Sequence, residues 1–185
     1  MSYELCEKKM DKEKAGNIRA TALLFRAIWA IDKKGDYKKG LKIYEKIIAS
    51  GHFLVDAYCG IGVCQKMLGD QEAAIAAAQE ALQIKDDHYK TLQLLASIYN
   101  SQGNDELTYE YVSRALACKP KTMTEISPRL AGLVRKALRG MPDDYIEDTV
   151  EFDYLDTTWI SWAEEFKKEY ETKHPRQMQE QNDIA

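Results

Sequence analysis

One short stretch combines residue types that could bind a phosphate or a metal ion, namely Cys59-Gly60-Ile61-Gly62 with Cys64 close behind. A dinucleotide-phosphate loop needs a strand before its glycines and a third glycine after them. Both glycines fall inside a helical pattern instead. Cys59 and Cys64 lie roughly 140° apart around a helix, so they cannot share one metal ion. Helix packing is therefore the expected role of these residues.

The three histidines, His52, His88 and His174, are far apart in the sequence. No Ser/His/Asp or Cys/His arrangement and no cluster of metal-ligating residues emerges from the spacing. An enzyme would need polar groups from distant parts of the chain to converge in one pocket. We therefore expect a protein that is not an enzyme and that needs neither a cofactor nor a metal.

Composition narrows the class of partner. The chain has 185 residues and a formal net charge of −4, which argues against a nucleic-acid ligand because phosphate contacts need a dense basic face. The N-terminus lacks the apolar core of a signal peptide. The apolar-rich run 20–31 is interrupted by Arg26 and is too short to cross a bilayer. These features predict a cytoplasmic protein with reduced, buried cysteines.

A fixed period organises most of the chain. Gly35, Gly69 and Gly103 are spaced 34 residues apart, and each separates two short helical patterns. Glycine suits the left-handed backbone conformation that follows a helix end. Such a period predicts an all-α array of antiparallel helix pairs. We place the three repeats at about 20–52, 55–86 and 89–120.

Each repeat shows apolar residues at helical spacing. The first has Leu24, Ala27, Ile28 and Ile31, and then Leu41, Tyr44, Ile47 and Ile48. The third has Leu92, Leu95, Ala96 and Tyr99, and then Thr108, Val112 and Ala115, with Pro120 just past its second helix. In the second repeat, the small residues Gly62, Ala74 and Ala81 predict a close approach of two helices.

These residues follow the tetratricopeptide pattern, and residues 20–120 resemble that family. The resemblance implies a right-handed superhelical solenoid in which the first helices of successive repeats line a concave groove for a partner peptide or helix. Transferred to this sequence, the groove carries the following candidate partner-binding residues: Phe25, Trp29, Lys33, Asp56, Cys59, Val63, Lys66, Met67, Lys90, Gln93, Ser97 and Asn100. It is apolar at its N-terminal end and polar at its C-terminal end.

The same family includes proteins that hold an acidic chaperone tail with a carboxylate clamp of Lys, Asn and Arg. The matching positions here are Phe25, Trp29, Gly60, Lys90 and Leu94, and only Lys90 fits. The resemblance therefore implies an adaptor or scaffold that binds an apolar peptide or helix of another protein. An alternative comes from residues 58–65, which resemble the second repeat of three-repeat secretion chaperones that bind an export substrate.

The period fails after the third repeat. Ser127 as N-cap, Pro128 at the first helical position and Gly140 past the end predict a helix, and we expect the segment 121–140 to cap the array. Residues 141–156 form an acidic-aromatic segment, with seven acids and no basic residue over 143–156. Residues 157–173 predict an amphipathic helix. We expect a polar lead-in over 1–19 and a disordered tail over 174–185.

The helix 157–173 carries an aromatic stripe, which consists of Trp159, Trp162, Phe166 and Tyr170. Two interpretations remain open. The stripe either packs onto its own chain or forms a second interface that docks a partner, which would make the protein a scaffold. The segment 143–170 could also dock on the groove of its own chain.

Overall fold

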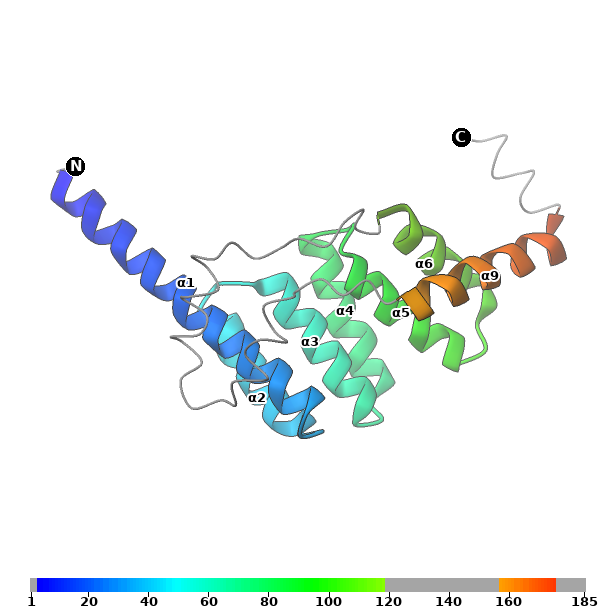
Figure 1. Cartoon of the computed structure of the whole chain (residues 1–185), viewed down its shortest axis with the longest axis horizontal. Coiled ribbons are helices and arrows are strands. Elements are labelled where there is room, and N and C mark those ends of the chain that lie inside the picture. Colours follow the sequence, from blue (N-terminus) through cyan, green and yellow to red (C-terminus); the bar gives the residue numbers. More distant parts are fainter. Residues whose placement is uncertain (1–2, 119–156, 176–185) are drawn as a thin grey trace.

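The computed structural model describes residues 3–118 and 157–175, and within these ranges it contains helices and no strand. The helices are α1 (Tyr3–Asp32), α2 (Tyr37–Ala49), α3 (Leu54–Met67), α4 (Gln71–Ile84), α5 (Tyr89–Ser101), α6 (Asp105–Cys118) and α9 (Thr157–Lys173). Figure 1 shows three helix pairs stacked in chain order, with α9 beside α5 and α6. The N-terminal part of α1 projects beyond the stack.

The turn inside each pair has the same construction. Gly35, Gly69 and Gly103 adopt positive φ angles of 60°, 90° and 70°. A side chain at such an angle would crowd the backbone, so glycine can end the first helix and reverse the chain at little cost. The period of the glycines therefore becomes the period of the array.

The residue after each of these glycines begins the second helix of its pair. Asp36 accepts a hydrogen bond from the backbone N–H of Lys39 at 3.0 Å, and Asp70 accepts one from Ala73 at 3.0 Å. Asn104 does the same for Leu107 at 3.1 Å. These caps satisfy N–H groups that have no partner inside the helix.

The helices pack both within and between pairs. α1 packs on α2, α3 on α4 and α5 on α6, and each second helix also contacts the next first helix, as α2 contacts α3 and α4 contacts α5. α9 contacts α6 in the same manner. It therefore takes the place of a fourth first helix, although residues 119–156 separate it from α6 along the chain.

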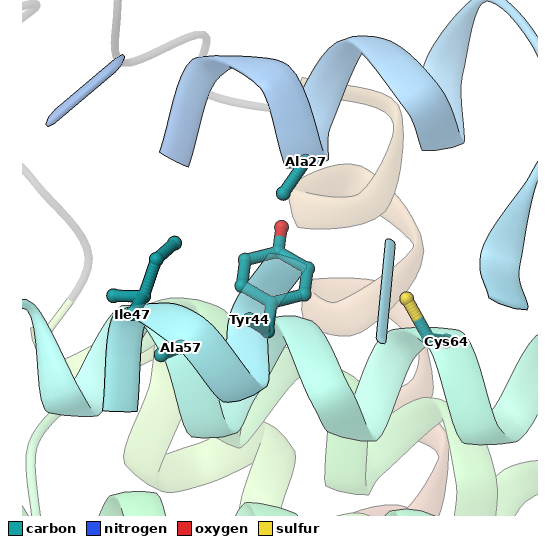
Figure 2. Packing of buried hydrophobic residues seen from close by; sticks show 5 residues of the cluster. All are labelled: Ala27, Tyr44, Ile47, Ala57 and Cys64. Atoms are coloured by element: carbon teal, nitrogen blue, oxygen red, sulfur yellow. The ribbon is translucent and has the colours of Figure 1, made fainter. Parts of the chain in front are cut away.

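The first buried cluster joins α1, α2 and α3, and Figure 2 shows its five residues: Ala27, Tyr44, Ile47, Ala57 and Cys64. The Tyr44 ring lies between the helices, and its hydroxyl points toward Ala27. A second cluster joins α4 and α5 around Ala74, Ala78 and Leu95. A third cluster joins α5, α6 and α9. The core is thus built along the array from one layer to the next.

Two glycines of α3 fill the role that the spacing predicts. A Cβ atom on Gly60 would overlap the Tyr44 ring, and one on Gly62 would come within 2.8 Å of Leu94 Cδ2 and 3.1 Å of the Ala74 carbonyl oxygen. The α3 backbone therefore lies directly against α2 on one side and against α4 and α5 on the other. This close approach leaves no room for a phosphate group at Gly60-Ile61-Gly62.

The N-terminal segment, for which the sequence predicts a polar lead-in over 1–19, is helical from Tyr3 onward. The segment lacks an apolar stripe, but it is rich in Glu, Lys, Met and Ala, which favour a helix without tertiary contacts. It therefore extends the first helix of the first repeat.

The C-terminal expectations are only partly covered by the structure. α9 spans residues 157–173, where an amphipathic helix is expected. His174, assigned to the tail by the sequence, stacks on Tyr170 with a ring-centroid distance of 4.3 Å. The expected capping helix 121–140, the acidic-aromatic segment 141–156 and the tail from 176 onward lie outside the described residues.

Candidate binding face of the first helices

The candidate site is the surface that α1, α3 and α5 share, here called the binding face. Each second helix is held between two first helices, and the first helices α3 and α5 contact each other directly. Side chains on this surface come from all three repeats. The face can therefore contact an extended segment or a helix of another protein.

On α1, the three predicted residues differ in accessibility. Phe25 is only 5% exposed and belongs to the core. Trp29 is half-buried, and the Lys34 ammonium lies 5.0 Å from its ring centroid. Lys33 is exposed. The apolar contribution of α1 to the binding face therefore rests on Trp29.

On α3, Cys59 and Val63 lie deeper than the sequence suggests. Cys59 is 6% exposed, and burial raises the pKa of its thiol to about 11, which keeps it protonated at neutral pH. Val63 is half-buried and packs against the α4–α5 cluster. Met67, at the end of α3, is 54% exposed. It supplies the accessible apolar surface of this helix.

Polar contacts join α3 to α5 at two levels. Lys66 Nζ donates a hydrogen bond to Ser97 Oγ at 2.5 Å, and burial lowers the pKa of Lys66 from its usual value. Near the start of α3, Asp56 Oδ1 lies 3.8 Å from His88 Nε2. These contacts set the spacing of the two helices, so Lys66, Ser97 and Asp56 act first as structural groups.

The sequence marks His88 only as a residue at a helix end. Its Nδ1 lies 2.7 Å from the Thr91 hydroxyl, which is fully buried at the start of α5. Burial lowers the pKa of His88, and the nearby Asp56 carboxylate partly opposes this shift. The imidazole is therefore neutral at pH 7, where its hydrogen bond to Thr91 lies at the start of α5 and its contact with Asp56 of α3 is a looser polar approach.

The rest of α5 presents polar groups. Lys90 and Asn100 are exposed, and Gln93 is half-buried. Burial raises the pKa of Asp32, at the end of α1, while the charges of Lys33 and Lys90 lower it. The Lys90 ammonium thus influences a carboxyl group on the first repeat. The first helices therefore carry both ammonium and carboxylate groups, since Lys33 and Lys90 lie near Asp32 and Asp56 is partly exposed on α3.

The aromatic stripe of α9 lies against the third repeat of its own chain. Trp159, Trp162 and Phe166 pack on the cluster around Ala96, Val112 and Ala163.

Aromatic contacts fix both ends of α9. Tyr170 stacks on Tyr109 of α6 at a ring-centroid distance of 4.5 Å, and the Tyr109 hydroxyl donates to Glu171 Oε1 at 3.0 Å. At the other end, the Trp159 ring meets Tyr89 of α5 edge-on at 5.8 Å. The stripe is thus engaged in packing within the chain.

Among residues 3–118 and 157–175, no group of three or more His, Cys, Asp or Glu side chains is placed to hold a metal ion. None of the helices in these ranges is both long enough and apolar enough to cross a membrane.

Comparisons with known proteins point to one family. Residues 55–88 match the model of the tetratricopeptide repeat. A curated relative is the Protein CTR9 homolog of Arabidopsis thaliana, which is 28% identical over 92 residues. That alignment covers 48% of this chain and 8% of the relative, so the chain spans a small part of that protein's length.

A solved structure, the crystal structure of MamA, aligns with 89% of this chain and 86% of its own, with a TM-score of 0.50 and 19% identity. At this identity the likeness concerns the fold alone. The matched repeat coincides with α3 and α4, which lie between two further helix pairs with the same glycine turns and polar caps. Residues 55–88 are therefore a tetratricopeptide repeat within an array of helix pairs of the same construction, and proteins with this repeat typically act as protein-interaction modules.

Proposed function

We propose that this protein is a non-enzymatic adaptor whose binding face holds a segment of a partner protein. The supporting observation is the group of accessible side chains that α1, α3 and α5 contribute to one side of the array. Met67 is 54% exposed, Trp29 is half-buried, and Lys33 and Lys90 are exposed. The binding face thus brings accessible apolar groups and ammonium groups from three successive repeats to the first helices.

The side chains of the binding face favour a ligand that has both apolar and acidic groups. Burial of apolar surface on Trp29 and Met67 stabilises a complex by roughly 25 cal/mol per Å². Lys33 and Lys90 favour carboxylates, which they steer toward the face. Phe25 and Cys59 are in the core and contribute shape rather than contact area. The preferred segment therefore combines large apolar side chains with acidic ones, in an extended or helical conformation.

The test compares two double variants of the tagged full-length chain. Met67→Asp with Lys90→Glu changes exposed residues of the binding face. The matched control, Ile84→Asp with Lys85→Glu, makes the same chemical changes at the end of α4, where Ile84 is 49% exposed. We expect the first variant to lose bound proteins that both the wild type and the control retain. Unchanged thermal unfolding shows that the fold is intact.

Equal loss from both double variants would contradict the proposal, because a general change in surface charge would then explain the result. Retention of the same proteins by all three chains would also contradict it.

A further inference from the structure

Lys66, near the end of α3, is a half-buried lysine of the binding face. Among the residues that the structure describes, no carboxylate pairs with its ammonium group, and burial lowers its pKa. By contrast, Lys85, Lys167 and Lys173 each lie within 3.8 Å of a carboxylate oxygen. A charge that is partly removed from water without a partner of opposite sign is costly. At a given pH, Lys66 is therefore neutral more often than an ordinary exposed lysine is.

The hydrogen bonds of Ser97 determine how the Lys66 amine is held. The Ser97 hydroxyl has one proton, which it donates to the Leu94 carbonyl oxygen at 2.9 Å. It therefore acts as the acceptor for Lys66 Nζ, which lies 2.5 Å away. This bond uses an N–H of Lys66. The lone pair that the neutral amine carries is consequently not directed at Ser97 and is left for a reaction.

The amine is accessible to a small molecule. Lys66 and Ser97 are half-buried, and the next residue along α3, Met67, is 54% exposed. α3 and α5 contact each other directly at this place. A reagent on a bulky carrier would meet both helices, whereas a small reagent can approach the partly exposed Nζ. The geometry therefore favours a small electrophile.

We propose that Lys66 is an acylation site that reacts with a small acyl phosphate. The neutral amine attacks the carbonyl carbon, so that a C–N bond forms and the bond between this carbon and the phosphate oxygen breaks. Inorganic phosphate leaves with the electron pair of that bond, and the amine loses one proton to water. The amide product is uncharged and keeps one N–H for Ser97, so the half-buried position accommodates it better than an ammonium group.

The reaction goes beyond the proposed function and does not depend on it. Acylation removes one positive charge between α3 and α5 and adds an apolar group beside Met67. On a face that holds a partner segment, this change shifts the preference from acidic toward apolar side chains. That consequence rests on the proposed function, whereas the experiments below follow the acylation alone.

The first experiment treats the full-length chain with a limiting amount of acetyl phosphate and measures the acetylation rate of each lysine by peptide mass spectrometry. Lys38 and Lys42, which are exposed on α2, serve as internal controls. We expect Lys66 to react at least about threefold faster than either control at neutral pH, because a larger share of its amine is neutral. Its rate should also level off at a lower pH. A rate equal to or below that of the controls would overturn the inference.

The second experiment changes the acceptor beside the amine. Ser97→Asp places a carboxylate next to Lys66 Nζ, which favours the ammonium form, and the Lys66 rate should fall to that of the controls or below. Ser101→Asp is the matched variant one turn later on α5, where Ser101 likewise donates its hydroxyl to a backbone carbonyl, that of Ile98, at 2.6 Å. It should slow Lys66 much less.

Thermal unfolding establishes that both variants keep the fold. Equal slowing of Lys66 by the two folded variants, or no slowing by Ser97→Asp, would overturn the inference. If Ser97→Asp does not fold, the comparison of Lys66 with Lys38 and Lys42 in the wild-type chain decides alone. Loss of bound proteins from the Met67→Asp, Lys90→Glu chain tests the proposed function separately, since neither substitution changes the Lys66 amine or its acceptor.

Discussion

The interior of the array and its C-terminal end are joined in opposite ways. Inside, α3 meets its neighbours through residues with little or no side chain, so that Gly60 lies under the Tyr44 ring and Gly62 against Leu94. At the end, α9 meets α5 and α6 through large rings, including Trp159, Trp162 and Tyr170. Close backbone contact fixes the interior geometry, whereas aromatic packing closes the last layer after the period has failed.

The interior and the C-terminal end should differ most in the reactivity of their cysteines. Burial raises the pKa of Cys59 and of Cys64 to about 11, and both thiols lie in the interior layers. At pH 8 we expect them to react with a thiol reagent at least about a hundredfold more slowly than in the unfolded chain. Cys118, half-buried at the end of α6, should react faster than either. Site-resolved mass spectrometry of labelling rates checks this order, and equal rates would contradict the distinction between interior and end.

The same pKa values give the pH dependence of stability. An unfolded thiol releases its proton near pH 9, whereas the folded protein holds both protons until about pH 11. The folded state therefore binds more protons over this interval, and the free energy of unfolding should fall as the pH rises from 9 to 11. Denaturant midpoints at successive pH values measure the fall. Serine at both positions should flatten the curve.

Truncation of one side chain should lower the free energy of unfolding most in the aromatic packing between α9 and the third repeat. Trp162→Ala removes the indole that packs between Trp159 and Phe166, with ring-centroid distances of 6.0 and 5.5 Å. We expect the free energy of unfolding to fall by about 3 kcal/mol. Urea unfolding measures the loss. A change below about 0.5 kcal/mol would show that α9 contributes little to the third repeat.

The packing of α3 on α2 should be disrupted by adding a side-chain atom rather than by removing one. Gly60→Ala places a Cβ in the Tyr44 ring, and we expect a loss of about 2 kcal/mol from overpacking even though alanine favours a helix more than glycine does. Tyr44→Leu in the same chain should recover part of the loss. A double-mutant cycle measures the coupling, and purely additive effects would contradict the contact.

The smallest expected loss of stability concerns one hydrogen bond at the C-terminal end of the array. Tyr109→Phe keeps the ring that stacks on Tyr170 and removes the hydroxyl that donates to Glu171. We expect a loss of about 1 kcal/mol. Glu171→Gln is the companion variant, because it keeps an acceptor and should cost less. A larger loss from Glu171→Gln would show that its charge matters more than this hydrogen bond.

Much of the fold follows from the sequence because its determinants are local. Gly35, Gly69 and Gly103 mark turns that each require a positive φ, and the polar residue after each one caps the next helix. The packing role of Gly62 is equally visible, since a small residue at a helical spacing has few other uses. These features need no knowledge of the tertiary arrangement.

The binding face could be predicted only in outline. Helical periodicity shows that Phe25, Cys59 and Val63 share a helix with exposed residues, but it does not give their depth, which depends on the neighbouring layer. The link from Asp56 through His88 to Thr91 joins two repeats and has no periodic pattern. The position of α9 is likewise hidden in the sequence, which favours residues 121–140 as the cap.

The place of α9 also bears on the order in which the chain folds. Every interior layer forms between helices that a short turn connects, whereas α9 reaches α6 across residues 119–156. Closing this longer loop costs about 2 kcal/mol more conformational entropy than closing a turn of about four residues. The docking of α9 therefore raises the contact order of an otherwise local fold. It should be the last and slowest step of folding, and α9 should be the first helix to detach when the chain begins to unfold.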